Sequence, residues 1–481
     1  LMPGGELMGL NVIDDYSFEF TFSIPYYRAV EVFAGGEYYA ASHALMKYMP
    51  AHNEEAEALA EEEGYESWQQ AFQFHAGTSD DYYDRDTTMP TLNPWIISEI
   101  GADSVLWTRN PYYWRVDTAG NQLPYMDEVL VIMTENVNAT APVKSLAGEL
   151  DINDFGLGID DFPVYKKGEE AGDYKVHLWP RLDQSHAMGF AFNYTYAPDE
   201  VLRELFNDLR FRQAMSLAIN REEIAENVFL GLVEPYTAPV SPAWPGYEDW
   251  MGNYYGEYDV EQANALLDEM GLEWDENGEW RLRPDGETLT VPGEWATEWL
   301  AYTEDLLDLV TIHWAEIGVK FEHKFVPEDT LQTMHVANEN AVGISNSDGG
   351  AEQLARGAYP IRLMPPWHWG STGCCPMSAY LWRVWLDTEG ADGIEPPDDI
   401  KRIYELVQQW LETPHGTDEY ISLINEVITL NVENLYYFGT VSSPPRVWII
   451  HNRMGNVPAE DGQLGAWGAR PYLHETYYIK Q

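Results

Sequence analysis

The sequence predicts an α/β protein built from more than one globular lobe. Its 481 residues exceed what a single hydrophobic core organises, and they suffice for two or three lobes. In the second half of the chain, a strand at 289–291 precedes an amphipathic helix at 303–317, and another strand follows at 319–325. Gly318 provides the stop of that helix. A strand, a helix and a strand in this order indicate a parallel α/β sheet.

The other elements are assigned from hydrophobic alternation, helix caps and glycine stops. Asn220 is expected to cap a helix within 199–231, with Glu223 three positions later and Gly231 as its stop. The Pro- and Gly-rich stretches 235–246 and 360–376 are expected to be surface connections. The remaining expected elements are a strand from about 10 to 25, helices at 53–63 and 65–75, strands at 104–109 and 129–133, a helix near 139–148 and a strand from 150.

Acidic side chains dominate the composition. There are 80 Asp and Glu against 27 Lys and Arg, which gives a net charge of −53 and a pI of about 4.3. Such a polyanion repels nucleic acid and acidic membrane surfaces, so neither is an expected partner. The acids are spread along the chain, which favours a solvated acidic coat over one dedicated cation site. No stretch approaches the roughly 20 apolar residues of a membrane helix.

Motifs that carry catalysis are mostly absent. The sequence has no Gly-x-Ser-x-Gly elbow, phosphate loop, His-Glu-x-x-His or dinucleotide fingerprint. The segment 275–278 is similar to a calcium loop, but Pro284 stands where the last glutamate is needed, so a hairpin turn is favoured. Cys374 and Cys375 are adjacent, as two buried thiols or as a strained vicinal disulfide. We therefore expect no catalytic residue, no metal and no cofactor.

Several segments, read in order, resemble one known family. They run Trp107 to Trp114, Leu123 to Val129, Gly148 to Ile152, Asp208 to Arg221, and Tyr258 to Leu272, with a hairpin after the last. Together they span roughly residues 10–325. This order resembles the large solute-binding proteins of the oligopeptide and dipeptide importers, called family 5.

The resemblance implies a two-lobe α/β fold of the periplasmic-binding-protein type, type II and cluster C-like, with hinge strands between the lobes. Residues 1–191 plus 441–481 are expected to form lobe I and residues 192–440 lobe II. The strand at 14–22 is expected well inside the family's length, so the first part of lobe I is expected to precede Leu1. A lipid anchor is expected there, with the protein held in the periplasm or at the cell surface.

The family's function implies a binding protein rather than an enzyme. The chain is expected to capture a small solute, an oligopeptide or an oligosaccharide, in a cleft between the lobes and to deliver it to ABC permease subunits in the membrane. It is expected to be a monomer. Two alternatives remain: a surface-layer or filament component that reuses the fold, and a secreted glycan hydrolase suggested by the abundance of tryptophan and carboxylate.

Five residues are the candidates for ligand binding. Asn346 and Asp348 lie in the stretch 343–350, where peptide-binding relatives carry an aspartate that pairs with the peptide's amino terminus. The tryptophan pattern of those relatives is absent here, so a turn aspartate beside two glycines is the alternative. Trp367, Trp369 and Trp382 could line the cleft, because indole faces stack on sugar rings and peptide side chains. Core packing is the alternative for each tryptophan.

Overall fold

The computed structural model describes residues 6–27, 29, 33, 41–76, 86–134, 136–181, 185–296, 302–345, 378–458 and 474–480. The first elements are two short antiparallel strands, β1 (Gly9–Asp14) and β2 (Ser17–Thr21). The prediction of one continuous strand from 10 to 25 is therefore wrong. The backbone N–H of Tyr16 donates to Asp14 Oδ1 at 2.8 Å, and this Asx turn reverses the chain inside the alternating pattern.

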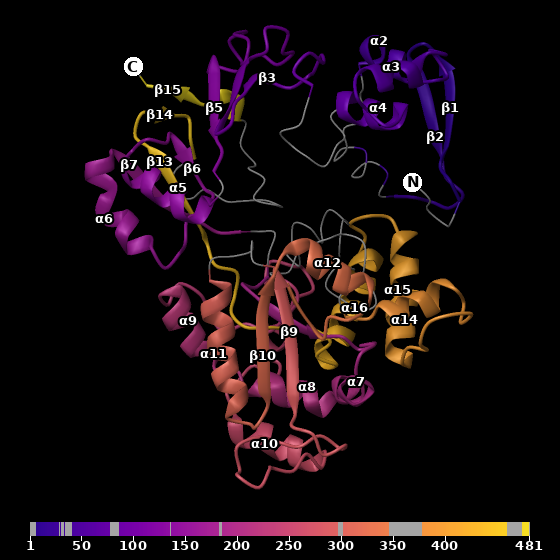
Figure 1. Cartoon of the computed structure of the whole chain (residues 1–481), viewed down its shortest axis with the longest axis vertical. Helices are drawn as coiled ribbons and strands as arrows, with labels where there is room; N and C mark the ends of the chain where they lie inside the picture. The colour runs from indigo at the N-terminus through magenta and orange to yellow at the C-terminus, as the bar shows by residue number, and fades with distance from the viewer. Residues whose placement is uncertain are drawn as a thin grey trace.

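A small helical unit follows the hairpin (Figure 1). It contains α2 (Ser42–Leu45), the 3₁₀ turn η2 (Met46–Tyr48), α3 (Ala56–Glu62) and α4 (Trp68–Ala76), which confirms the helices expected at 53–63 and 65–75. Among the described residues its buried hydrophobic cluster is small and consists of Leu45, Tyr48, Ala60 and Ala71. So small a core contributes little stability by itself, and polar contacts take on a larger share.

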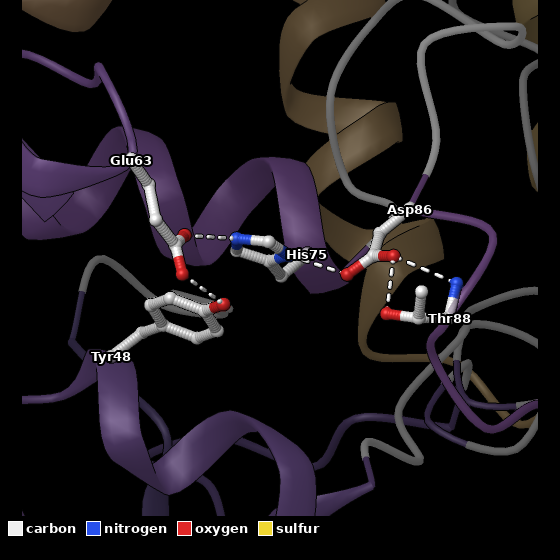
Figure 2. A network of polar contacts seen from close by, with 5 residues as sticks. All are labelled: Tyr48, Glu63, His75, Asp86 and Thr88. Carbon is white, nitrogen blue, oxygen red and sulfur yellow. Dashed lines mark hydrogen bonds and ion pairs between the residues drawn. The ribbon is translucent and has the colours of Figure 1, made fainter. Parts of the chain in front are cut away.

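Figure 2 shows the polar contacts that hold this unit together. The Nδ1 of His75 lies 2.6 Å from Asp86 Oδ2, and its Nε2 lies 2.8 Å from Glu63 Oε2. Each ring nitrogen of His75 thus faces a carboxylate oxygen, which places the ring between the two acids. Tyr48 stacks on His75 with ring centroids 4.0 Å apart. Burial alone would raise the pKa of Asp86, but hydrogen bonds from Thr88 and His75 outweigh burial and hold the pKa below its usual value.

The next sheet is an antiparallel meander of β3 (Trp95–Ile100), β4 (Ser104–Arg109) and β5 (Glu128–Ile132), as expected for 104–109 and 129–133. The end of the chain packs against the loop between β4 and β5. Glu475, in the 3₁₀ turn η5 (His474–Thr476), accepts hydrogen bonds from Tyr113 Oη at 3.0 Å and Arg115 Nη1 at 2.7 Å. Residues about 360 positions apart are thus joined by a buried carboxylate.

A second antiparallel sheet combines strands from the middle and the end of the chain, in the order β6-β13-β7. Trp179 and Trp448 pack on one side of it, with ring centroids 4.7 Å apart. Its strands and the elements around it are β6 (Ile152–Asn153), β7 (Tyr174–Trp179), β13 (Arg446–His451), α5 (Val137–Leu146), α6 (Phe162–Gly172), β14 (Met454–Gly455) and β15 (Tyr478–Ile479). In Figure 1 this group lies above the larger group that contains β9 and β10.

The larger group contains two sheets. One is the parallel pair β9 (Thr290–Ala296) and β10 (Lys320–Val326), which confirms the α/β unit predicted from the sequence. The other has the order β11-β8-β12, with β8 (Gly189–Phe192), β11 (Val342–Ser345) and β12 (Phe438–Gly439). The surrounding helices are α7 (Glu200–Asn207), α8 (Leu209–Leu217), α9 (Arg221–Phe229), η3 (Asp249–Asn253), α10 (Val260–Glu269), α11 (Thr303–Ala315), α12 (Glu328–Val336), α14 (Tyr380–Asp387), α15 (Asp398–Leu411) and α16 (Asp418–Glu433).

Local signals read from the sequence are found in these helices. The side chain of Asn220 accepts a hydrogen bond from the backbone N–H of Glu223 at 3.1 Å, as its cap position predicts. Gly318 has a φ of +73° three residues after the end of α11, where a Cβ atom would also lie 2.7 Å from the ring of Trp274. The segment 275–278 forms the expected turn, since Asp275 N donates to Trp280 O at 2.7 Å.

One connection lies deeper than expected. The stretch 235–246 is irregular, as predicted, but it is not a surface loop. Tyr236, Ala238, Val240 and Trp244 are all buried. The indole N–H of Trp244 donates to Asn425 Oδ1 at 2.7 Å, and this bond anchors the connection against α16. Within the described ranges, no helix is long and apolar enough to cross a membrane.

Candidate functional site

Two chain segments connect the sheet β6-β13-β7 with the sheet β11-β8-β12. One leads from β7 to β8 and the other from β12 to β13, and Figure 1 shows the latter as the yellow chain that rises to β13. They run antiparallel beside each other: Ala187 N donates to Val441 O at 2.9 Å, and Thr440 N donates to Met188 O at 2.9 Å. A pair of strands is the kind of connection that lets two bodies rotate as units.

His186 lies in the segment from β7 to β8, is fully buried, and faces Ser442 of the other segment. Its Nε2 lies 2.5 Å from Tyr437 Oη, and its Nδ1 lies 2.8 Å from Ser185 Oγ and 3.3 Å from Ala238 O. Burial lowers the pKa of His186 to about 3, although the Ala238 carbonyl acts in the opposite direction. The ring is therefore neutral. Because a carbonyl can only accept, the proton belongs on Nδ1, which leaves Nε2 to accept from Tyr437.

We call the place where these two segments pass side by side from one sheet to the other the crossing. Close packing there requires glycine. A Cβ on Gly189 would lie 2.4 Å from the ring of Tyr437, and a Cβ on Gly439 would lie 2.7 Å from the carbonyl oxygen of Tyr236. Arg221, at the start of α9, is buried and donates to Gly439 O from two nitrogens at 3.1 and 3.0 Å. The guanidinium thus ties the first turn of α9 to the point where β12 leaves its sheet.

Of the five candidate ligand residues, Asn346, Asp348, Trp367 and Trp369 lie outside the described residues, as do Cys374 and Cys375. Trp382 is described. It lies in α14, is 3% exposed, and stacks on Tyr194 with ring centroids 5.2 Å apart and planes 5° apart. It belongs to the large core cluster. A role for Trp382 in ligand binding stays a prediction.

Trp382 also lines a pocket of about 780 Å³ among α7, α8, α14 and α15. The guanidinium carbon of Arg212 lies 5.4 Å from the ring centre of Tyr194 and 5.1 Å from that of Tyr436, so the cation is held between two aromatic walls. Burial raises the pKa of both tyrosines, which therefore stay neutral. The pocket is also lined by Arg203, Glu204, Asn207, Leu209, Ile394, Glu395, Pro396, Pro397, Asp399 and Asn434.

No group of three His, Cys, Asp or Glu residues in the described part of the chain has the arrangement of a metal site. The sequence had singled out neither His186 nor Arg212. Arg212 sits inside the helix motif that carried the family resemblance, which is a signal for structure rather than for a pocket. His186 and Tyr437 are 251 positions apart, and no local pattern connects them.

Comparison with known proteins decides the family. The model of "Bacterial extracellular solute-binding proteins, family 5 Middle" matches residues 5–362. The chain belongs to this family. The family resemblance seen in the sequence is thereby confirmed.

Individual relatives of this family 5 protein differ in what their names say they bind. It is 31% identical over 204 residues to the periplasmic alpha-galactoside-binding protein of Rhizobium meliloti, which covers 40% of this chain and 28% of the relative. It is 30% identical over 176 residues to the oligopeptide-binding protein of Bacillus subtilis, covering 35% of this chain and 28% of the relative. The matched part thus spans less than a third of either relative.

Solved structures extend the likeness over almost the whole chain. An oligopeptide-binding protein matches with a TM-score of 0.69 and 30% identity, covering 98% of this chain and 75% of that one. The stachyose complex of a periplasmic binding protein from Agrobacterium fabrum matches with a TM-score of 0.70 and 20% identity, covering 99% of this chain and 67% of that one. The two-lobe α/β fold of the family 5 binding proteins is confirmed.

Proposed function

We propose that this chain is the substrate-binding subunit of an ABC importer, which captures an oligopeptide or an oligosaccharide between two lobes and delivers it to permease subunits. The family supports the role, and the relatives' names supply both ligand classes. The structural observation that carries the proposal is the crossing of two antiparallel segments around His186. Such a crossing lets two bodies close on a ligand while the chain between them stays hydrogen-bonded.

We place the lobes at 1–191 plus 441–481 and at 192–440. This division is supported by the return of β13 to pair with both β6 and β7, and by the contact of Glu475 with Tyr113 and Arg115. The strand pairing and the Glu475 contacts each join the end of the chain to its first half. Packing is continuous through the crossing, because Tyr174 and Val447 share the large core cluster with Phe190 and Phe438.

In this proposal the protein binds its ligand without catalysing a reaction. It acts as a monomer outside the cytoplasm. The matching family comprises extracellular solute-binding proteins, and the relatives named above are binding proteins. Attachment through a lipid stays a prediction.

The first experiment measures the melting temperature of the protein with stachyose and with a nonapeptide. A ligand at about 100 times its dissociation constant stabilises the folded state by about 2.7 kcal/mol, so either ligand class gives a clear upward shift. If neither class shifts the melting temperature, and if calorimetry detects no heat of binding, the proposal is wrong.

Asp348→Asn then separates the two ligand classes. An ammonium partner lost from a binding site weakens peptide binding by about tenfold or more and leaves sugar binding unchanged. Asp127→Asn is the matched control, because the Asp127 side chain is 88% exposed. Equal binding of the nonapeptide by both variants would remove Asp348 from the site.

A further inference from the structure

The pocket beside Trp382 is separate from the crossing. The described residues that line it all fall between 194 and 436, within one proposed lobe. Its described lining thus comes from one proposed lobe. Its volume of about 780 Å³ lies within the range of small-molecule sites, roughly 300–1,000 Å³.

Arg212 and Trp382 each bring to the pocket lining a hydrogen-bond donor that has no partner among the described residues. The first is Nη2 of Arg212; Nε and Nη1 of the same side chain donate to Asn434 O and Phe206 O, each at 2.8 Å, and fix the guanidinium in place. The second is the indole Nε1 of Trp382. Both residues are only 3% exposed. An acceptor group of a ligand that reaches these donors would form hydrogen bonds with them, and the bond to the guanidinium would be charge-assisted.

The outer residues of the pocket have the opposite character. Glu204 and Glu395 are exposed, and Glu204 has no ion pair among the described residues. Asp399 accepts a hydrogen bond from Tyr436 Oη on Oδ2 at 2.6 Å, which leaves Oδ1 available. The lining carries these three carboxylates and two guanidinium groups, those of Arg203 and Arg212, and Glu395 also pairs with Lys401 Nζ at 2.7 Å. The chain's net charge of −53 adds to the carboxylates in disfavouring a simple anion. A simple cation, in turn, would leave the two inner donors unpaired.

We propose that this pocket binds a small zwitterion, such as a free amino acid, as a second ligand site beyond the interlobe cleft. The carboxylate of the ligand accepts from Arg212 and Trp382 at the buried wall. Its ammonium group lies among the carboxylates of Glu204, Glu395 and Asp399 at the mouth. The carbon chain between the two charges packs on the apolar and aromatic lining.

The test is calorimetry with the whole chain and a series of unbranched amino acids from glycine to 6-aminohexanoate. The series varies the distance between the charges, and hexanoate and hexylamine each lack one of them. We expect saturable binding of at least one member of the series, about tenfold tighter than either singly charged analogue. Glu204→Gln removes a charge at the mouth, and Trp382→Phe removes the indole donor while keeping an aromatic ring. Each should weaken binding by about fivefold or more.

Glu412→Gln is the matched control. Glu412 is exposed and follows the C-terminal end of α15, about 20 Å along the helix from Asp399. It should bind like the wild type. If Trp382→Phe does not fold, the Glu204→Gln variant decides alone. Absence of saturable binding up to about 20 mM, equal binding of the single-charge analogues, or unchanged affinity in Glu204→Gln would overturn the proposal. Binding of stachyose or the nonapeptide by the same variants reports on the cleft separately.

Discussion

Protonation of His186 in the unfolded chain should destabilise the folded protein as the pH falls. In the unfolded chain a histidine gains a proton below about 6.5. In the folded protein, burial lowers the pKa of His186 to about 3, so the ring stays neutral over the interval between these values. Stability that is present above pH 6.5 is lost as the pH falls through this window. At pH 5 the loss from this one group amounts to about 2 kcal/mol.

His186→Gln isolates this effect. Glutamine keeps a donor and an acceptor for Ala238 O and Tyr437 Oη, but it does not titrate. The free energy of unfolding is measured in urea at pH 8 and pH 5 for both proteins. Other acids and histidines titrate in both, so they cancel in the difference between the two losses. We expect the wild type to lose about 2 kcal/mol more than the variant.

A direct readout is the proton resonance of the His186 ring, identified by its absence from the variant. It should not shift between pH 8 and about pH 4.5. Equal losses of stability in the two proteins, or a His186 resonance with a midpoint above about pH 5, would show that the ring is not buried in a neutral form.

Three further predictions concern caps, a local network and charge. Asn220→Ala should lower the free energy of unfolding by about 1 kcal/mol, because the N–H of Glu223 loses its acceptor; Asn220→Asp, which keeps the acceptor, is the control, and urea denaturation is the measurement. Asp86→Asn should speed amide exchange around Thr88, whose backbone N–H donates to the Asp86 carboxylate. In the wild type this hydrogen bond should weaken as the pH falls below about 3.8, because the pKa of Asp86 is held below that value. Unchanged exchange would count against the network in Figure 2. Salt raised from about 0.05 M to about 1 M should raise the melting temperature, since screening reduces the self-repulsion of a net charge of −53; a flat or falling response would contradict this.

Signals that act within a few residues were correctly predicted. The cap at Asn220, the stop at Gly318 and the turn at 275–278 each depend on hydrogen bonds or backbone angles within one turn of chain. The parallel pair β9 and β10 followed from the order of strand, helix and strand. The family followed from the order of such local segments along the chain.

Where local signals fit more than one structure, contacts with other parts of the chain determined which one forms. The alternating segment near residue 14 fits one long strand or two short ones, and the turn at Asp14 with the pairing of Gly9 to Thr21 selects two. The stretch 235–246 has the composition of a surface loop, but Tyr236 and Trp244 find buried partners and draw it inward. Composition reports which side chains can be solvated and does not say which neighbours exclude the solvent.

The sequence by itself determined the α/β class, most helix and strand positions and the family, because these depend on periodicity, caps and segment order. Only the tertiary structure brought His186 to Tyr437, set Arg212 between Tyr194 and Tyr436, and placed the indole of Trp382 beside that pair. These contacts join residues that are between 18 and 251 positions apart in the chain. A contact of that kind depends on how the folded chain returns to itself, which no pattern of neighbouring residues encodes.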